Sequence, residues 1–202
     1  MPDANSQIPP QDAGRATEAQ QPFSIRPSTL ADVDAMLAIY RHHIERGVDP
    51  SAVRDIEEIH PEEIKRRRKN FRNRHLPHLV VERRGEILGY AYVVPFRKRP
   101  AYRYAVKHSI YIRHDQQRMG FGRLLLPALI DASAAAGYRQ MIGYIDAANV
   151  ASLRLHENCG FKRVGYLPGV GFKFGQWTDV VMVQRSLGAG DTTSPGASPA
   201  LV

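Results

Sequence analysis

The stretch that decides the fold runs over residues 104–123, where a strand pattern passes into a glycine loop and then into a helix. Tyr104–Arg113 alternates like a strand, and Gln117-Arg118-Met119-Gly120-Phe121-Gly122 follows it. A helical pattern begins at about Gly122 and ends at Gly137. Glycines at such a junction let the backbone approach a ligand, and the unpaired first-turn amides of a helix favour phosphate. The stretch predicts a phosphate-binding loop, with a plain helix cap as the alternative.

Two well-known nucleotide-binding patterns do not fit this loop. No Gly-Lys-Ser/Thr sequence ends it, so it is not a Walker loop. The dinucleotide fingerprint needs a third glycine and an acidic residue about 20 positions further on, and both are missing.

The rest of the chain predicts one α/β domain over residues 23–187, between disordered tails at residues 1–22 and 188–202. Helices are expected from about Ser28 to Arg46, from Pro61 onward, and over Val150–Asn158. The remaining expected strands are 23–26, 79–81, 87–94, 141–145, 161–165 and 180–185. This order indicates a mixed sheet, neither a Rossmann repeat nor a barrel.

Composition narrows the class of protein and of ligand. The chain has 202 residues and a net charge of +8, concentrated in residues 60–84 (net +6) and 95–123 (net +7). Such localised charge suggests an anionic ligand: nucleic acid, a membrane surface or a phosphorylated cofactor. The single cysteine, Cys159, excludes an internal disulfide, and the histidines show no metal-ligand spacing, so no metal is expected. Without a long apolar run or a secretory leader pattern, we expect a cytoplasmic protein that does not bind membranes.

A second motif, Asn149 to Phe161, gives the glycine loop a context. The two motifs at this distance resemble the GCN5-related N-acetyltransferase (GNAT) superfamily. Further segments resemble its phosphinothricin and L-amino-acid N-acetyltransferase branch, over roughly residues 23–187. These segments are Ile25-Arg26-Pro27, Gly89-Tyr90-Ala91-Tyr92, Pro100-Ala101-Tyr102-Arg103, Arg154-Leu155-His156-Glu157 and residues 171–179.

The resemblance implies a GNAT-type mixed, mostly antiparallel central sheet flanked by helices, with acetyl-CoA as co-substrate. The backbone of Ile110, Tyr111 and Ile112 would pair with the pantetheine arm and polarise the thioester carbonyl. The loop residues Gln117, Arg118, Met119, Gly120, Phe121 and Gly122 would hold the pyrophosphate. Asn149 and Ser152 would contact the pantetheine arm, and the branch suggests a homodimer.

The catalytic candidates are His156, Lys107 and His108. His156 occupies the place of a general acid in the superfamily, and a histidine can act as acid or base near neutral pH. Lys107 stands where the branch has a glutamate base; a charged lysine cannot accept a proton, although burial could discharge it. Strand alternation places His108 on the opposite face from Lys107, so His108 is the weaker candidate for the base.

Two other departures from the branch fall on the acceptor side as well. A Thr-Phe-Glu segment is not recognisable in residues 49–59, and Phe174 replaces a histidine. We therefore expect an intact acetyl-CoA site and a diverged acceptor pocket, for which phosphinothricin-like amino acids are poor substrates.

The resulting prediction is an N-acetyltransferase that acts on a small-molecule amine, an amino acid or an analogue of one. The alternatives are a peptide or protein N-acetyltransferase of the same fold and a catalytically impaired acetyl-CoA-binding regulator. Nucleic-acid binding through the basic run Lys65–Lys69 is not expected, because no aromatic residues are interleaved with it and no known binding module is present.

Overall fold

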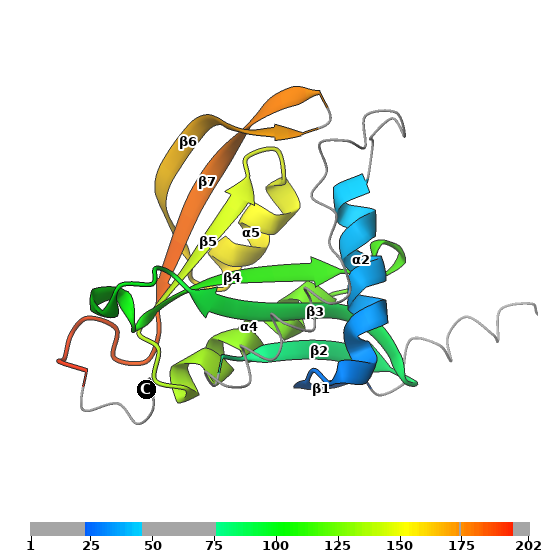
Figure 1. Cartoon of the computed structure of the whole chain (residues 1–202), viewed down its shortest axis with the longest axis horizontal. Helices are drawn as coiled ribbons and strands as arrows, with labels where there is room; N and C mark the ends of the chain where they lie inside the picture. Colours follow the sequence, from blue (N-terminus) through cyan, green and yellow to red (C-terminus); the bar gives the residue numbers. More distant parts are fainter. Residues whose placement is uncertain (1–22, 46–75, 174, 196–202) are drawn as a thin grey trace, which may run out of the picture.

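A seven-stranded sheet organises the molecule, and the computed structural model describes residues 23–45, 76–173 and 175–195. Its strand order is β1-β2-β3-β4-β5-β7-β6, and every neighbouring pair is antiparallel except β4 with β5 (Figure 1). This arrangement is the mixed, mostly antiparallel sheet predicted from the sequence. The strands are β1 Ser24–Pro27, β2 His78–Arg83, β3 Glu86–Pro95, β4 Ala105–Ile112, β5 Gln140–Asp146, β6 Lys162–Lys173 and β7 Gln176–Ser186.

Helices cover both faces of the sheet. Helix α2 (Val33–Glu45) crosses one face and α4 (Phe121–Ala135) lies against the other, while α5 (Val150–Asn158) packs beside β5 (Figure 1). Among the described residues, short 3-10 turns lie at Leu30–Asp32, Pro100–Tyr102 and His114–Gln116.

Strand alternation divides the buried side chains into two cores. In β2, Leu79 and Val81 pack with the α4 side, whereas Val80 packs under α2. The larger core joins the sheet to Leu125, Leu126 and Leu129 of α4 and extends to Val181, Val183 and Phe161. The smaller core sets Val33, Met36 and Ile39 of α2 against β2 and β3. Burial on both faces holds the central strands in a single register.

The hairpin of β6 and β7 is longer than the sequence analysis predicted. Expected strands at 161–165 and 180–185 are the inner parts of strands that extend to Lys173 and begin at Gln176. Register shifts between Arg163 and Gly165, and between Leu167 and Gly171, interrupt the alternation on which the prediction relied. Three aromatic side chains are exposed on this hairpin: Tyr166, Phe172 and Trp177. Homodimer formation stays a prediction.

The chain continues in turns past the domain end expected at residue 187, as far as Pro195, and Arg139 donates to Thr193. Several predicted features lie outside the described residues: the N-terminal tail, the helix from Pro61, the basic run Lys65–Lys69, the region of residues 49–59, Phe174 and residues 196–202. Within the described ranges, no helix is both long enough and apolar enough to span a membrane.

Candidate active site

The site is built around a gap between the two parallel strands. Among the described residues, β4 and β5 pair only over Ala105–Lys107 against Gln140–Ile142, and the strands then separate. Beyond His108, the edge of β4 that faces β5 is open. An extended ligand can hydrogen-bond to such an edge as an added strand would.

Backbone alternation shows which residues of β4 face the gap. Arg113 N donates to Leu88 O, and Ala105 O accepts from Phe96 N, so odd-numbered residues direct their backbone groups toward β3. Neighbouring residues in a strand direct these groups to opposite sides. Ile110 therefore presents its N–H and its C=O to the gap.

The other two predicted backbone contacts are placed differently. Tyr111 directs its backbone toward β3, and its ring stacks on Tyr90 with centroids 5.1 Å apart. Ile112 faces the gap, but its carbonyl accepts a hydrogen bond from His43 Nε2 of α2 at 2.9 Å. Ile110 differs from Ile112 in that no hydrogen bond between described residues holds its gap-facing carbonyl.

The glycine loop joins the end of β4 to α4 and adopts the conformation that its glycines favour. Gly120 is the N-cap of α4 with φ +88°, and Arg118 also has a positive φ, +63°. No side chain caps α4, and the Arg123 N–H donates to Gly120 O, so the amides of Phe121 and Gly122 are the ones at this helix end that can bind a ligand. At Gly122, a Cβ would lie 3.1 Å from Leu155 of α5. These features fit a phosphate group held by backbone amides.

Helix α5 starts beside the same gap, and its cap uses a predicted ligand-binding residue. Asn149 Oδ1 accepts a hydrogen bond from the backbone N–H of Ser152 at 3.0 Å. The amide oxygen of Asn149 thus fixes the first turn, and Ser152 is half-buried one turn before His156. The cap holds Ser152 and His156 in a fixed relation to each other.

His108 and His156, from β4 and α5, touch through their rings at the point where the strands separate. Their Nε2 atoms are 2.7 Å apart, and the side chains are 8% and 2% exposed. His108 Nδ1 lies 3.0 Å from Ile142 O, and His156 Nδ1 lies 2.7 Å from Ser152 O. Burial lowers the pKa of both imidazoles; that of His108 falls to about 3, and the neighbouring His156 is the next contributor.

Lys107 lies on the other face of β4, as alternation predicted. Its Nζ is 6.0 Å from the centroid of Tyr144, a residue that also faces away from the larger core. The Lys107 ammonium and the histidine pair are therefore on opposite faces of the sheet. The three catalytic candidates do not form one cluster.

Two groups of positive charge lie at opposite ends of β4. Arg118 and Arg123 are exposed beside the glycine loop, whereas Arg113 is held by Asp115 and Glu86. The second group, which we call the basic loop, is Arg97, Lys98, Arg99 and Arg103 between β3 and β4. Eight residues of strand, about 23 Å, separate the two groups. The basic loop therefore cannot serve a phosphate held by the glycine loop.

Gly143 of β5 is a site residue that the sequence analysis missed. A Cβ there would lie 2.6 Å from His108 Cε1 and 2.9 Å from Val183. The missing side chain makes room for the His108 ring at the apex of the gap. A glycine inside a strand pattern was the available signal, because it often marks a close approach.

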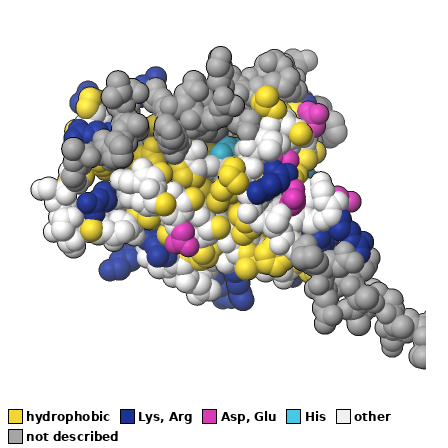
Figure 2. All heavy atoms as spheres, turned by 90° about the horizontal axis from the view of Figure 1, so that it is seen from below, with side chains coloured by type: hydrophobic (Ala, Val, Ile, Leu, Met, Phe, Trp, Pro, Cys, Tyr) yellow, Lys and Arg dark blue, Asp and Glu magenta, His cyan; other side chains and the backbone are white. Residues whose placement is uncertain are grey.

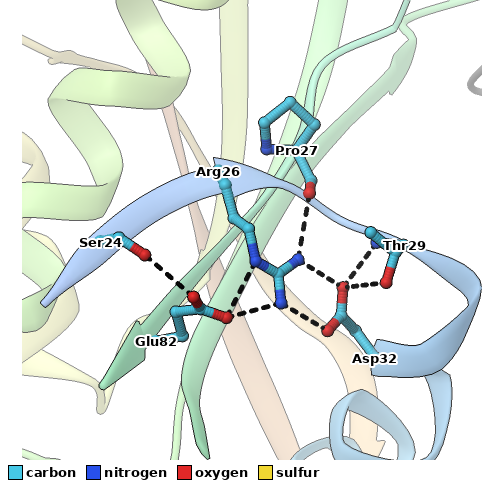
Figure 3. A network of polar contacts seen from close by, with 6 residues as sticks. All are labelled: Ser24, Arg26, Pro27, Thr29, Asp32 and Glu82. Carbon is cyan, nitrogen blue, oxygen red and sulfur yellow. Dashed lines mark hydrogen bonds and ion pairs between the residues drawn. The ribbon is translucent and has the colours of Figure 1, made fainter. Parts of the chain in front are cut away.

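A cavity of about 870 Å³ lies beside α2 and the β2–β3 turn and reaches Arg113 and His114 after β4, and no predicted site residue is among its described lining residues. On its wall, Arg26 donates to both oxygens of Asp32 and to Glu82 at 2.6–2.9 Å (Figure 3). These hydrogen bonds lower the pKa of Asp32 to about 2. Thr29 also donates to Asp32, so the network ties β1 and β2 to the start of α2.

Comparisons with known proteins agree with this geometry. Residues 25–182 match the family model described as an acetyltransferase (GNAT) domain. A phosphinothricin N-acetyltransferase of Alcaligenes faecalis is 44% identical over 81% of this chain and 82% of its own length. An L-methionine sulfoximine/L-methionine sulfone acetyltransferase of Pseudomonas aeruginosa is 36% identical over 81% of this chain and 94% of its own. The crystal structure of a phosphinothricin acetyltransferase from Sinorhizobium meliloti in complex with acetyl-CoA superposes with a TM-score of 0.79. It is 34% identical and covers 87% of this chain and 94% of the other.

The fold and the gap between β4 and β5 thus define an N-acetyltransferase that uses acetyl-CoA. The chain belongs to the GNAT family, and its relatives place it in the phosphinothricin and L-amino-acid N-acetyltransferase branch, as its motifs predicted.

Proposed function

We propose that this enzyme acetylates the amine of a small molecule, an amino acid or a close analogue of one. The carrying observation is the pair of charged ends of β4. The glycine loop fits the phosphates of acetyl-CoA, and the basic loop offers separate positive charge for an acceptor that bears its own anionic group, such as a carboxylate. The names of the relatives, phosphinothricin and L-methionine sulfoximine acetyltransferases, support the same class of acceptor.

On the face that Figure 2 shows, the described Lys and Arg side chains are scattered and do not form one broad patch. A nucleic-acid site needs clustered positive charge along one face. The basic loop is short, and its guanidinium groups lie over its own aromatic rings: Arg97 over Phe96 and Tyr102, and Arg103 over Tyr104. Those rings orient the charges locally.

In this proposal, each part of the gap has one task. Acetyl-CoA supplies the thioester. The amides of Gln117–Gly122 and the start of α4 hold its phosphates, and the Ile110 N–H is placed to donate to a carbonyl oxygen in the gap, where a preorganised donor stabilises developing negative charge. Asn149 keeps the first turn of α5 in place. Lys107 leaves the site without the carboxylate base of the branch.

Lys107 affects the acceptor through its charge. An acceptor amine arrives as an ammonium ion, since α-amino groups have a pKa near 8. A lysine on β4 beside the gap raises the local potential and favours loss of the ammonium proton, but it also weakens binding of the charged acceptor. The proton must then leave through another group.

The proposal is tested by thermal unfolding with acetyl-CoA and by thiol release across a panel of amines. We expect acetyl-CoA to raise the Tm, and amino acids to release CoA thiol faster than amines without a carboxylate. Phosphinothricin is expected to be a poor substrate because of the altered acceptor side. Release of thiol with peptides alone, or no release with any amine despite acetyl-CoA binding, contradicts the proposal.

Lys107→Glu and Lys107→Gln sharpen this test. If the missing carboxylate limits the rate, Lys107→Glu raises kcat/KM for amino acids and Lys107→Gln, which only removes the charge, does not. If both variants raise kcat/KM above the wild-type value by the same factor, loss of the Lys107 charge alone explains the gain. Lower activity in both shows that Lys107 itself contributes to acetyl transfer.

A further inference from the structure

The histidine pair has more hydrogen bonds than neutral rings can supply. A backbone carbonyl only accepts, so the contact of His108 with Ile142 O needs a proton on His108 Nδ1. The contact of His156 with Ser152 O needs one on His156 Nδ1 for the same reason. The contact between the two Nε2 atoms needs a third. Two neutral imidazoles carry only two N–H protons.

The surroundings of the two rings favour the neutral form of the pair, in which each imidazole carries one N–H proton. Both rings are buried, and burial lowers the pKa of each. The rings lie against Phe161, and against Gly143 of β5, neither of which ionises. Of the charged groups on the elements packed around them, Lys107 points to the other face of β4 and Arg185 of β7 donates to Cys159 O. Within the described residues, no carboxylate contributes to the shift of either ring.

Only one of the three contacts offers a second partner. His108 Nδ1 meets the Ile142 carbonyl, which has no proton to give. His156 Nδ1 meets both the carbonyl oxygen of Ser152 at 2.7 Å and the Ser152 hydroxyl at 3.4 Å. When Nδ1 loses its proton, the hydroxyl can turn and donate to it. The proton of the pair is therefore gained and lost at His156 Nδ1.

We propose that His108 is a positioning residue that holds His156 as its Nε2–H tautomer, so that His156 exchanges its proton at Nδ1 through the Ser152 hydroxyl. With His108 Nδ1 donating to Ile142, the Nε2 of neutral His108 can only accept, and His156 Nε2 must donate to it. The contacts of His108 with Ile142 O and with His156 Nε2 remain intact in both protonation states of His156.

The relay gives the proton of the acceptor a route that does not need the missing glutamate; in this respect it rests on the proposed function. An N–H bond of the acceptor ammonium breaks, and its electron pair stays on nitrogen. The proton joins Ser152 Oγ as the serine proton passes to His156 Nδ1, where a new N–H bond forms. The reverse movement returns one proton to the gap. Each transfer moves a single proton and leaves Ser152 neutral.

Ser152 is suitably placed for this exchange. It is half-buried, whereas both rings are buried, so the hydroxyl is the part of the relay that reaches outward. Its backbone N–H is held by Asn149, which limits its movement to rotation of the side chain. Gly143 keeps the His108 ring at the apex of the gap.

The direct test is imidazole ¹⁵N NMR of the ligand-free protein, which reads the tautomers without any catalysis. We expect His156 at pH 7–8 to carry its proton on Nε2 and His108 to carry its proton on Nδ1. On acidification, His156 Nδ1 gains the proton. A wild-type His156 found as the Nδ1–H tautomer at neutral pH overturns the proposal, even if no variant folds.

Two substitutions of His108 test its role. His108→Met fills the space without an acceptor, and His156 should change to the Nδ1–H tautomer that donates to Ser152 O. His108→Gln keeps an oxygen near the position of Nε2 and should preserve the Nε2–H tautomer. An unchanged tautomer in His108→Met, or a changed one in His108→Gln, contradicts the assignment.

Kinetics test Ser152 and separate the relay from the proposed function. Ser152→Ala should lower kcat about tenfold or more and flatten the acidic limb of the pH profile of kcat. Ser152→Thr keeps the hydroxyl and should restore kcat to within a few-fold. Full kcat in Ser152→Ala overturns the relay alone, whereas a wild-type protein that acetylates no amine overturns the proposed function and leaves the NMR result standing.

Discussion

Two polar clusters join distant parts of this chain, and they differ in how their hydrogen bonds are balanced. In the Arg26 cluster, one guanidinium meets the carboxylates of Asp32 and Glu82, and every contact is an ion pair or a charge-assisted hydrogen bond (Figure 3). In the histidine pair, three hydrogen bonds each need a proton, and two neutral imidazole rings carry only two N–H protons.

The difference separates a structural cluster from a chemical one. In the Arg26 cluster, each guanidinium nitrogen of Arg26 donates to an acceptor. The charged forms resist titration because each charge stabilises the other. The histidine pair is stable in two protonation states because Ser152 can fill either role. Damage to the first should reduce stability, and damage to the second should reduce activity.

The largest effect is expected from His156→Gln. Loss of the exchanging nitrogen should lower kcat about 100-fold or more, the range for removal of a general acid or base. The free energy of unfolding should fall by only about 1 kcal/mol, because a glutamine can keep one of the two ring contacts of His156 and loses the other. Steady-state kinetics and urea unfolding measure the two. His114→Gln, at an exposed histidine, is the control and should change neither; a His156→Gln enzyme with wild-type kcat contradicts the chemical role of the pair.

Arg26→Met should reverse this pattern. Its side chain is 31% exposed, so the loss is smaller than for a fully buried ion pair, about 2–3 kcal/mol in the free energy of unfolding. The kcat of the folded protein should stay within about twofold, because the cluster is remote from the gap between β4 and β5. Arg41→Met, at an exposed arginine that lines the same cavity, should cost less than about 0.5 kcal/mol. Equal losses in both variants would show that the ion pairs add nothing.

Gly143→Ala tests the space that the histidine pair needs. The new Cβ would meet His108 and Val183, two side chains that are themselves confined, so the fold should lose about 1–2 kcal/mol. Because the His108 ring must shift, kcat should fall as well. At Gly165, a Cβ would meet the flexible Met182 side chain at 3.3 Å, so Gly165→Ala should have a smaller effect and leave kcat unchanged. An unaltered kcat in Gly143→Ala would show that the pair tolerates displacement.

The smallest effect is the pH dependence of stability from Asp32. Its pKa in the folded protein, about 2, is below the ordinary value of 3.8, so its contribution is fully present above about pH 4 and is lost as the pH falls toward 2. At pH 3 the loss is about 1 kcal/mol. Denaturant unfolding between pH 6 and pH 3 measures it, with Arg26→Met as the comparison. The same slope in wild type and Arg26→Met would assign the dependence to other groups.

Much of the fold could be predicted because local patterns and tertiary packing agree. The alternation of residues 104–113 and the glycine loop after it are set by short-range geometry, and they placed β4, the loop and α4 within a few residues. The outer half of the β6–β7 hairpin was missed for the opposite reason. Strand β6 passes Pro168 and Gly169 through a register shift, with φ +56° at Gly169, and residues 171–173 then pair with residues 176–178 of β7, a contact that no local pattern predicts.

The site shows the same division. Strand alternation correctly separated His108 from Lys107, because it depends only on neighbouring positions. The contact of His108 with His156 joins residues 48 positions apart and depends on where α5 packs against β4, which no local pattern encodes. The carbonyl partners of both rings, and the space at Gly143, could be found only from the assembled structure.

The short pairing of β4 with β5 also has a mechanical consequence. Strands β1–β4 and β5–β7 form two panels. Among the described residues, β4 and β5 pair over three residue pairs, and His108 adds contacts with Ile142 O and with His156 across the same line. This line has fewer residue pairs than any other between neighbouring strands of the described sheet, so the sheet should bend most easily there. A ligand that lies in the gap and hydrogen-bonds to both panels adds contacts between them and restricts their relative movement. The stiffness of the sheet across its full width is thus supplied in part by what it binds.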